Sequence, residues 1–541
     1  MERREQVPQA PAREGLALAR WLAEPLSSEH AALLTQHIRG RRWFRGKARK
    51  IEDIKVVDHV SLADDANELV IAIVRVRYLA DPPELYVVPL GLAHAEAAAP
   101  ASPLVELPEG WVYDPTGGQL LSERLLHLQL RAETPGRRGV IVAQPEAALI
   151  AKVAGDPSRL PARVPSGEQS NTSVFYGQEL MLKLFRVLES GSNPDVEINQ
   201  FLWQHGYRHV PEPLGSLRYQ RDGLDAVLGI TQRFIASEGT AWELTLAQVE
   251  RAYELALERS LPLDTMVPSR DLLESSQQQP PAELHALLGP YAEQAALLGK
   301  RTAQLHVVLA SDADNAAFQP EPMSAQYLQT QVKITRERIT RNYDLLSHQL
   351  ANMPASTRVL ANDVLAARDQ LLGLLDGVAS ARVDASLIRC HGDYHLGQVL
   401  YTGTDFVLLD FEGEPAQTIE VRRQKRSALY DVCGMLRSFH YAATFALLGP
   451  RWRPEERQAL RPAAEVWHRW VSALFLGAYL QEASSGGRRP VFLPQTTEQL
   501  RTLLPLHLID KCAYELGYEL NNRPDWVGVP LAALLSLANP N

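Results

Sequence analysis

The first part of the chain carries the alternating pattern of apolar and polar residues that is typical of half-buried strands. Helical spacing over Leu16–Arg39 comes first. Strand-like runs then follow at 54–60, 69–78 and 85–90. In the second run Val74, Val76 and Tyr78 alternate with two arginines, which indicates a strand with one buried and one wet face. This pattern predicts a small α+β unit.

Short strands and helices continue to about residue 240, ending in the strand-like run Ala226–Ile235, and from about 283 the spacing is mostly helical. Residues 96–118 are rich in Pro, Gly and Ala and predict a boundary, while 260–282 predicts an exposed linker or insertion. One β interruption lies at 387–413. The layout predicts an α+β, two-lobed, protein-kinase-like fold with an added N-terminal cap and a mostly helical C-terminal lobe. We place the cap at 1–105, a β-rich ATP-binding subdomain at 106–237 and the helical lobe at 238–541.

Composition narrows the class of protein. With 45% hydrophobic and 22% charged residues, the composition is typical of a globular protein. The length of 541 residues predicts two or three domains. Its net charge of −9 argues against a protein that grips a nucleic acid. The three scattered cysteines favour neither disulfides nor a zinc site, and no run reaches the roughly 18 apolar residues of a membrane span. We therefore expect a cytoplasmic protein that neither binds nucleic acid nor enters a membrane.

The strongest motif is His391–Gln398, HGDYHLGQ. In the catalytic loop H-R-D-x-x-x-x-N of protein kinases, the Asp lies near the attacking hydroxyl and the Asn holds a metal. Here His391 precedes Asp393 by two positions, and the amide of Gln398 follows Asp393 by five. Asp410 comes at the end of an apolar run, where its carboxylate can reach the same metal. The spacing predicts phosphoryl transfer, with Asp393 and His391 in the catalytic loop and Mg²⁺ on Gln398 and Asp410.

The residues expected to hold ATP lie upstream. Lys183 is a cation on an apolar strand, and Asn193 and Pro194 open a helix that carries Glu197. We expect Lys183 to pair with Glu197 and reach the nucleotide phosphates, with Asp195 as the competing partner. The polar loop at 166–173 predicts a phosphate cover. Four further residues are assigned to the nucleotide: Ser170, Asn171, Gln232 and Phe234.

With these motifs in place, the chain resembles the maltokinase family, kinases similar to aminoglycoside phosphotransferases and also found as the C-terminal part of trehalose synthase fusions. The resemblance rests on HGDYHLGQVLYTGTDFVLLDFEGEP, on RRWFRGKAR at 41–49 and on segments at 166–185, 422–443 and 511–531. It implies ATP- and Mg²⁺-dependent phosphorylation of maltose at its anomeric hydroxyl, in trehalose-to-glycogen metabolism, with a possible trehalose synthase partner. Glucosamine, an aminoglycoside or a choline-like alcohol are alternative acceptors. A catalytically dead glucan-binding or scaffold module is the alternative from another class.

Sugar sites combine aromatic faces with groups that bond hydroxyls. For the acceptor we assign His395, Glu412, Arg437, Tyr441, Tyr514, Tyr518 and Trp526. Core packing is the competing interpretation of each tyrosine, and Asp431 is a competing structural partner for Arg437. Trp43 and Phe44, among four cations at 42–49, predict packing of the cap on the kinase lobe, or regulation, rather than nucleic-acid binding. His306 is expected to be a core or groove histidine.

Overall fold

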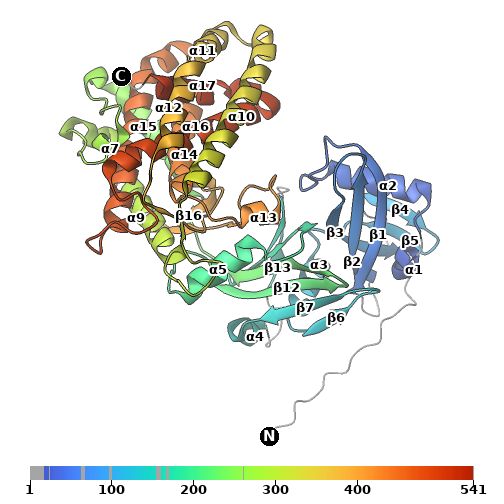
Figure 1. Cartoon of the computed structure of the whole chain (residues 1–541). Helices are drawn as coiled ribbons and strands as arrows, with labels where there is room; N and C mark the ends of the chain where they lie inside the picture. Colours follow the sequence, from blue (N-terminus) through green and yellow to red (C-terminus); the bar gives the residue numbers. More distant parts are fainter. Residues whose placement is uncertain are drawn as a thin grey trace. The chain divides into compact units, whose positions relative to one another are not determined.

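A computed structural model describes residues 17–23, 25–62, 68–96, 100, 102–153, 160–165, 170–259 and 261–539. The chain divides into two compact units. The first contains residues 1–200, 211–236 and 416–419, and the second contains 201–210, 237–415 and 420–541. Figure 1 shows that strands gather in the first unit and long helices in the second. The predicted α+β fold is confirmed, while the proposed three-part division at 105 and 237 stays a prediction.

The first unit holds two antiparallel sheets. The three predicted strand-like runs become β1, β2 and β3, and the structure pairs them in succession. The first sheet has the order β1-β2-β3-β5-β4, with β11 also on β3. Its bounds are Ile51–Ser61 (β1), Glu68–Tyr78 (β2), Glu84–His94 (β3), Pro103–Leu107 (β4), Gly110–Tyr113 (β5) and Val187–Leu188 (β11). Two helices precede it, α1 (Ala17–Ala23) and α2 (Ser28–Gly40).

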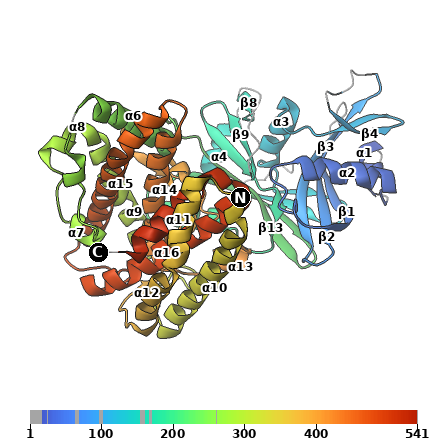
Figure 2. The same cartoon turned by 90° about the horizontal axis from the view of Figure 1, so that it is seen from above.

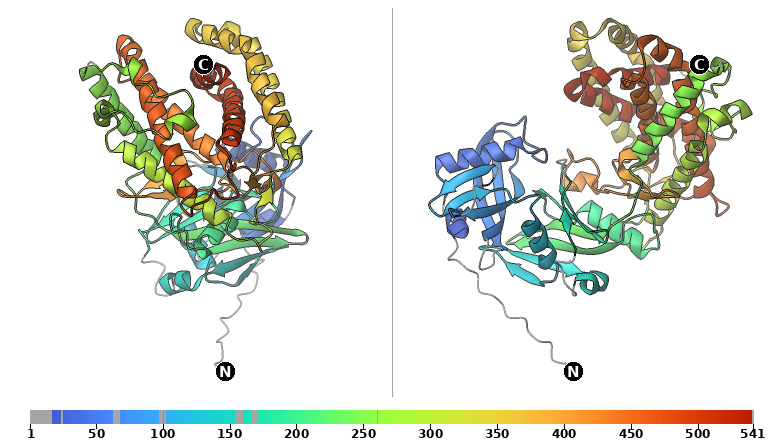
Figure 3. Two further views of the ribbon diagram at one scale, coloured as in Figure 1. Left: turned by 60° about the vertical axis from the view of Figure 1, so that its left-hand side comes forward. Right: turned by 180° about the vertical axis from the view of Figure 1, so that it is seen from behind.

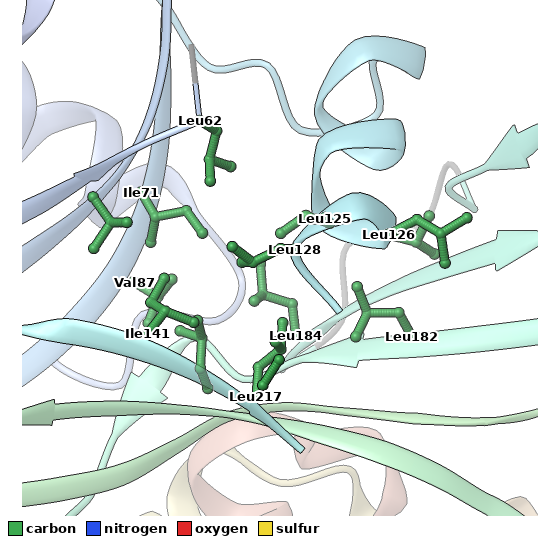
Figure 4. Packing of buried hydrophobic residues seen from close by; sticks show 14 of the residues in the cluster. Leu62, Ile71, Val87, Leu125, Leu126, Leu128, Ile141, Leu182, Leu184 and Leu217 are labelled. Atoms are coloured by element: carbon green, nitrogen blue, oxygen red, sulfur yellow. The ribbon is translucent and has the colours of Figure 1, made fainter. Parts of the chain in front are cut away.

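The second sheet has the order β6-β7-β12-β13-β10-β9-β8. Its strands are Glu133–Pro135 (β6), Val140–Pro145 (β7), Ala162–Arg163 (β8), Thr172–Tyr176 (β9), Leu180–Leu184 (β10), Pro213–Arg221 (β12) and Leu224–Arg233 (β13). The helices α3 (Gln119–Leu128), α4 (Ala147–Val153) and α5 (Pro194–Gln204) accompany it. Figure 4 shows Leu62, just after β1, and Ile71 of β2 in one cluster with Leu125 of α3 and with Leu184 and Leu217 of the second sheet. One hydrophobic core therefore joins both sheets of this unit.

The arginine-rich segment at 41–49 lies against the first sheet. Trp43 and Phe44 are buried, and both rings contact Tyr86 of β3 at centroid distances of 5.8 and 5.2 Å. Arg49 donates to Glu84 at 2.7 Å, and the same carboxylate accepts from the Tyr78 hydroxyl at 2.6 Å. These contacts make the aromatic pair part of the core on the first sheet. The predicted packing of the cap on the kinase lobe stays a prediction.

The second unit is a helical assembly. Figure 2 shows α10, α12 and α16 side by side, and Figure 3 shows the same helices, yellow to red, from two other directions. The segment 261–282, expected to be an exposed linker or insertion, packs within this unit. Trp470 Nε1 donates to the Met266 carbonyl at 2.9 Å, and Leu273 and Ser275 are buried. The long helices are α6 (Ala241–Glu258), α9 (Tyr291–Leu309), α10 (Ala325–Gln349), α11 (Ala355–Ala366), α12 (Arg368–Ser380), α14 (Leu429–Leu448), α15 (Pro454–Ala483), α16 (Thr497–Asn522) and α17 (Gly528–Ala538).

Short elements complete this unit. The catalytic-loop motif lies between β15 (Ser386–Leu387) and the hairpin of β16 (Val399–Tyr401) and β17 (Phe406–Leu408). A single 3₁₀ turn, η5 (Leu396–Gln398), carries the predicted metal-binding amide. The other short elements are η2 (Leu263–Thr265), α7 (Leu272–Ser275), η3 (Ala282–Leu284), α8 (His285–Leu288), β14 (Glu321–Pro322), η4 (Leu350–Asn352), α13 (Ile419–Arg422) and η6 (Pro524–Trp526). The predicted β interruption in a helical region is present.

Candidate active site

Lys183 lies in the middle of the second sheet of the first unit. It stands on β10, opposite Ser173 of β9 and Ile230 of β13, so its strand is fully paired. Its ammonium nitrogen lies 2.9 Å from Asp195 Oδ2, and the two side chains are only 11% and 3% exposed. A buried ammonium requires such a partner, since an isolated charge at this depth is strongly disfavoured. The ion pair holds the Lys183 cation in one place.

The helix that supplies this carboxylate begins as the sequence predicts. Asn193 Oδ1 accepts the Asp195 N–H at 2.8 Å, and Pro194 is the first residue of α5. The carboxylate 2.9 Å from the Lys183 ammonium is that of Asp195, the competing candidate, whereas the sequence analysis favoured Glu197. The two residues are about 200° apart around the helix axis, so they face different directions. The nucleotide role of Glu197 stays a prediction.

The other residues assigned to the nucleotide lie at the same sheet. Gln232 is buried on β13 opposite Met181, and Phe234 follows that strand with its ring edge-on to Phe175 at 5.8 Å. Asn171 accepts the Arg186 N–H at 3.3 Å, and Ser170 is exposed. Residues 166–169 of the predicted phosphate loop lie outside the described residues.

In the second unit a buried carboxylate holds the backbone of the catalytic loop. Asp431, on α14, accepts the N–H of His391 at 2.7 Å and that of Gly392 at 2.9 Å. His306 of α9 contacts the same carboxylate at 3.2 Å, and both side chains are fully buried. Burial alone would raise the pKa of Asp431, but His306, His391 and the Gly392 N–H lower it below its ordinary value. A charged Asp431 therefore fixes the loop that presents Asp393.

His391 connects this loop to the strand end before Asp410. Its Nε2 lies 2.9 Å from the Leu409 carbonyl, and its ring contacts the rings of Tyr394 and Phe411. The side chain is buried. These contacts are those of a positioning residue, and a direct catalytic role for His391 stays a prediction.

Gln398 and Asp410 form the pair expected to hold the metal. Gln398 Nε2 donates to Asp410 Oδ2 at 3.1 Å, which brings an amide and a carboxylate together although they are twelve positions apart. Asp410 has a φ of +64°, and it is the one non-glycine residue with a positive φ in the described part of the chain. Backbone strain of this kind is often found at functional sites. Carboxylate and amide oxygens are ligands that suit Mg²⁺, so the pair fits the expected metal.

Lys511 is a site residue that the sequence analysis missed. Its ammonium nitrogen lies 3.8 Å from Asp393 Oδ1, and the two side chains are 16% and 27% exposed. Burial alone would lower the pKa of Lys511, but the charges of Asp393, Glu414 and Glu515 raise it above its ordinary value. The ammonium group is therefore charged beside the proposed base. The only sequence signal was its place at the start of the segment 511–531.

Four of the residues assigned to the acceptor lie on α14 and α16. Arg437 forms a buried ion pair with Glu515 at 2.8 Å, rather than with Asp431. Tyr441 donates to Glu519 at 3.0 Å, and the Tyr514 ring lies 5.2 Å from the Lys511 ammonium. Three more side chains complete this set, with Tyr518 exposed, Trp526 stacked on Phe445 and Glu412 buried.

His395 belongs to the catalytic loop itself. Its Nδ1 accepts the Gly397 N–H at 3.1 Å, closing the turn that leads to Gln398. Burial lowers the pKa of this imidazole, and the positive charge of Lys511 lowers it further, while Asp393 opposes them. A neutral His395 at pH 7 follows, and its predicted contact with an acceptor stays a prediction.

No helix within the described residues has both the length and the apolar character that crossing a membrane requires.

Comparison with known proteins identifies the class first. A solved glucosamine kinase in complex with glucosamine, ADP and inorganic phosphate aligns with a TM-score of 0.59 at 19% identity, over 92% of this chain and 96% of that one. A second crystal form of glucosamine kinase aligns with a TM-score of 0.60, also at 19% identity, over 96% and 98%. The chain has the fold of these kinases. Glucosamine kinase of Mycolicibacterium smegmatis is 24% identical over 372 residues, 68% of this chain and 78% of that protein.

The family resemblance then becomes more specific in one region. Residues 37–117 match the maltokinase N-terminal cap domain. The chain carries this cap, and the resemblance to maltokinases seen in its sequence is confirmed there. Glucosamine kinase of Streptacidiphilus jiangxiensis, 24% identical over 68% of this chain and 72% of that protein, is a further relative.

Proposed function

We propose that this protein is an ATP-dependent kinase that phosphorylates a neutral sugar, with maltose favoured, at the anomeric hydroxyl. The observation that carries the proposal is the arrangement around Asp393. Its carboxylate stands on a loop anchored by Asp431, in the same unit as the Gln398–Asp410 oxygen pair. Phosphoryl transfer needs a positioned acceptor hydroxyl and stabilised phosphate charge, and these groups are of the right kind.

Each residue has a defined task in this mechanism. Asp393 accepts the proton of the acceptor hydroxyl as that oxygen attacks the γ-phosphorus and the bond to ADP breaks. Lys183, fixed by Asp195, contacts the phosphates. Gln398 and Asp410 would hold Mg²⁺, which supplies charge neutralisation at the transferred phosphoryl group when it is bound.

The charges near Asp393 support a neutral acceptor. Glu515 is paired with Arg437, Glu519 with Arg523, and Lys511 lies among Asp393, Glu414 and Glu515. A site for an ammonium-bearing acceptor would be expected to offer carboxylates without a cationic partner. Every carboxylate of this group except Glu414 has a Lys or Arg within 4.0 Å. Glucosamine is the second candidate, favoured by the names of the relatives.

The experiment is an ATP-consumption screen with maltose, glucose, glucosamine and an aminoglycoside, with Mg²⁺ and with a chelator. We expect maltose turnover, and a phosphorus NMR signal of an anomeric phosphate in the product. Asp393→Asn should lower kcat by about 10²–10⁴-fold, because general base catalysis contributes this much. Exposed Asp369→Asn on α12 is the matched control.

Three results would contradict the proposal. Wild-type kcat in Asp393→Asn would remove the assigned base. Turnover of glucosamine but not maltose would keep the kinase and replace the acceptor, and consumption of no ATP with any acceptor would favour a binding or scaffold module. The trehalose synthase partner, the role in glycogen synthesis and the cytoplasmic location stay predictions of the resemblance.

A further inference from the structure

Helices α14 and α16 are joined by a row of side-chain pairs that leads away from the catalytic loop. On α14, Arg437, Tyr441 and Phe445 are spaced by four, so they share one face of the helix. Arg437 bonds Glu515 at 2.9 Å and Tyr441 bonds Glu519 at 3.0 Å. Phe445, the next residue of this row, stacks on Trp526 in η6, just beyond the end of α16.

This last pair is aromatic and partly exposed. The rings of Phe445 and Trp526 lie 5.0 Å apart with 17° between their planes, and Trp242 of α6 meets Phe445 edge-on at 5.7 Å. Phe445 is 40% exposed. In contrast, Ala442 and Ala446 on the neighbouring face of α14 are buried. Three separate elements thus bring aromatic rings to one place without enclosing them.

Two contacts connect the helices that carry Phe445 and Trp242 to the catalytic loop and to the hairpin that follows it. Ser438 Oγ on α14 accepts the Leu396 N–H at 3.1 Å. Phe445 lies seven residues further along the helix, about 10 Å from Ser438 along the axis. On the other side, Thr240 forms a bridge to Leu400 of β16, and Trp242 follows two residues later. The cluster therefore has a fixed position further along α14 than Arg437 and Tyr441.

We propose that Phe445 and Trp526, with Trp242 at their edge, form a platform for the second ring of a disaccharide acceptor. The inference rests on the proposed function and adds to it the feature that distinguishes a disaccharide from a monosaccharide. A pyranose presents C–H groups on its face and hydroxyls on its rim. The aromatic rings suit the face. Glu519 and Arg523, which bond each other at 2.8 Å next to this cluster in the chain, suit the rim.

The ligand expected at this platform follows from the order of Arg437, Tyr441 and Phe445 along α14. With the anomeric hydroxyl at Asp393, the first ring lies near Lys511, Arg437 and Tyr441, where charged groups bond hydroxyls. Phe445 lies beyond the reach of that ring, at the far end of the same row. A monosaccharide would leave the platform empty, whereas the non-reducing glucosyl ring of maltose would cover it. Phe445 and Trp526 are thus specificity-determining residues and take no part in the chemical step.

The test compares a disaccharide and a monosaccharide on the same variants. We expect Phe445→Ala and Trp526→Ala to raise KM for maltose about five- to tenfold, since an aromatic contact of this kind is worth about 1–1.5 kcal/mol. Their kcat should stay near wild type, and kcat/KM for glucose or glucosamine should change less than twofold. Phe445→Tyr keeps the ring and should restore the maltose KM. Exposed Val359→Ala on α11 is the control for loss of a surface apolar group.

Isothermal titration with maltose gives a second measure that does not need turnover. If the wild type binds maltose and Phe445→Ala weakens that binding selectively, the platform stands even when no phosphorylation is seen, and only the proposed function fails. Equal losses for maltose and the monosaccharide, or no loss for either, would overturn the platform while leaving a sugar kinase in place. Absence of maltose binding to the wild type would also overturn it. Should Phe445→Ala not fold, Phe445→Leu and Trp242→Phe provide the same comparison.

Discussion

Each of the two units contains one lysine–aspartate pair of the residues assigned to catalysis, and the two pairs differ in closeness and exposure. Lys183 and Asp195 are 2.9 Å apart with side chains 11% and 3% exposed. Lys511 and Asp393 are 3.8 Å apart with side chains 16% and 27% exposed. The first pair is a close contact in a sheet interior. The second is a loose contact in a wetter place.

The difference matches the tasks proposed for the two pairs. A cation that contacts phosphates needs a fixed position, and a close carboxylate provides it. A general base must instead release its neighbour and accept a hydroxyl proton, which a tight ion pair would hinder. The geometry thus agrees with the proposed roles, in which Lys183 is the functional residue of the first pair and Asp393 that of the second.

The largest effect is expected when the close pair is broken. Lys183→Met leaves the Asp195 carboxylate buried without its cation, which should lower the free energy of unfolding by about 3–5 kcal/mol. ATP turnover should be lost as well. The measurement is urea unfolding together with the ATP-consumption assay.

A double variant then separates stability from function at this pair. Lys183→Met with Asp195→Leu removes both charges, so we expect most of the lost stability to return while turnover stays absent. If turnover recovered with stability, the Lys183 ammonium would have no role at the phosphates and the pair would be structural alone.

The sequence predicted these two pairs unequally, and the reason is physical. The strand of Lys183 and the cap and helix of Asp195 are local features, so periodicity and capping rules locate both within a few turns of chain. Even there the rules favoured Glu197, because a spacing along a helix does not say which face meets the sheet. The packing of α5 in the first unit decides that, and it is a tertiary property.

The partner of Asp393 could not be predicted by such local rules. Motif spacing located Asp393, Gln398 and Asp410, because they belong to one short loop and hairpin. Lys511 comes from a helix far along the chain, and only the packing of α16 brings it to Asp393. Asp431 and His306 were out of reach for the same reason, since their contact is made between α14 and α9. Local chemistry can be read from sequence here, while the partners supplied by distant helices cannot.

A second prediction concerns the loss of stability in acid, which depends on a buried histidine near Lys511. Burial lowers the pKa of His507, which lies on α16 four residues before Lys511, to about 4. The unfolded chain binds this proton at about pH 6.5. Stability is therefore complete above pH 6.5 and is lost as pH falls toward 4, by about 2 kcal/mol at pH 5.

The measurement is the free energy of unfolding by urea at pH 7.5 and at pH 5. The difference in the free energy of unfolding between the two pH values should be smaller by about 2 kcal/mol in His507→Gln than in the wild type. In the control, exposed His285→Gln on α8, this difference should equal that of the wild type. The same slope in wild type and His507→Gln would show that another group of the chain controls acid stability.

The smallest effect is expected at the loose pair. In a double-mutant cycle on unfolding free energy, Asp393→Asn and Lys511→Met should couple by less than about 1 kcal/mol, because a partly exposed contact at 3.8 Å gains little. The Lys183–Asp195 cycle should give a coupling at least twice as large. Lys511→Met should nevertheless raise KM for the sugar, since its charged ammonium lies where the acceptor hydroxyls would bind. A coupling at Asp393 equal to that at Lys183 would mean that both pairs are structural, and the assignment of Asp393 as the free base would fall with it.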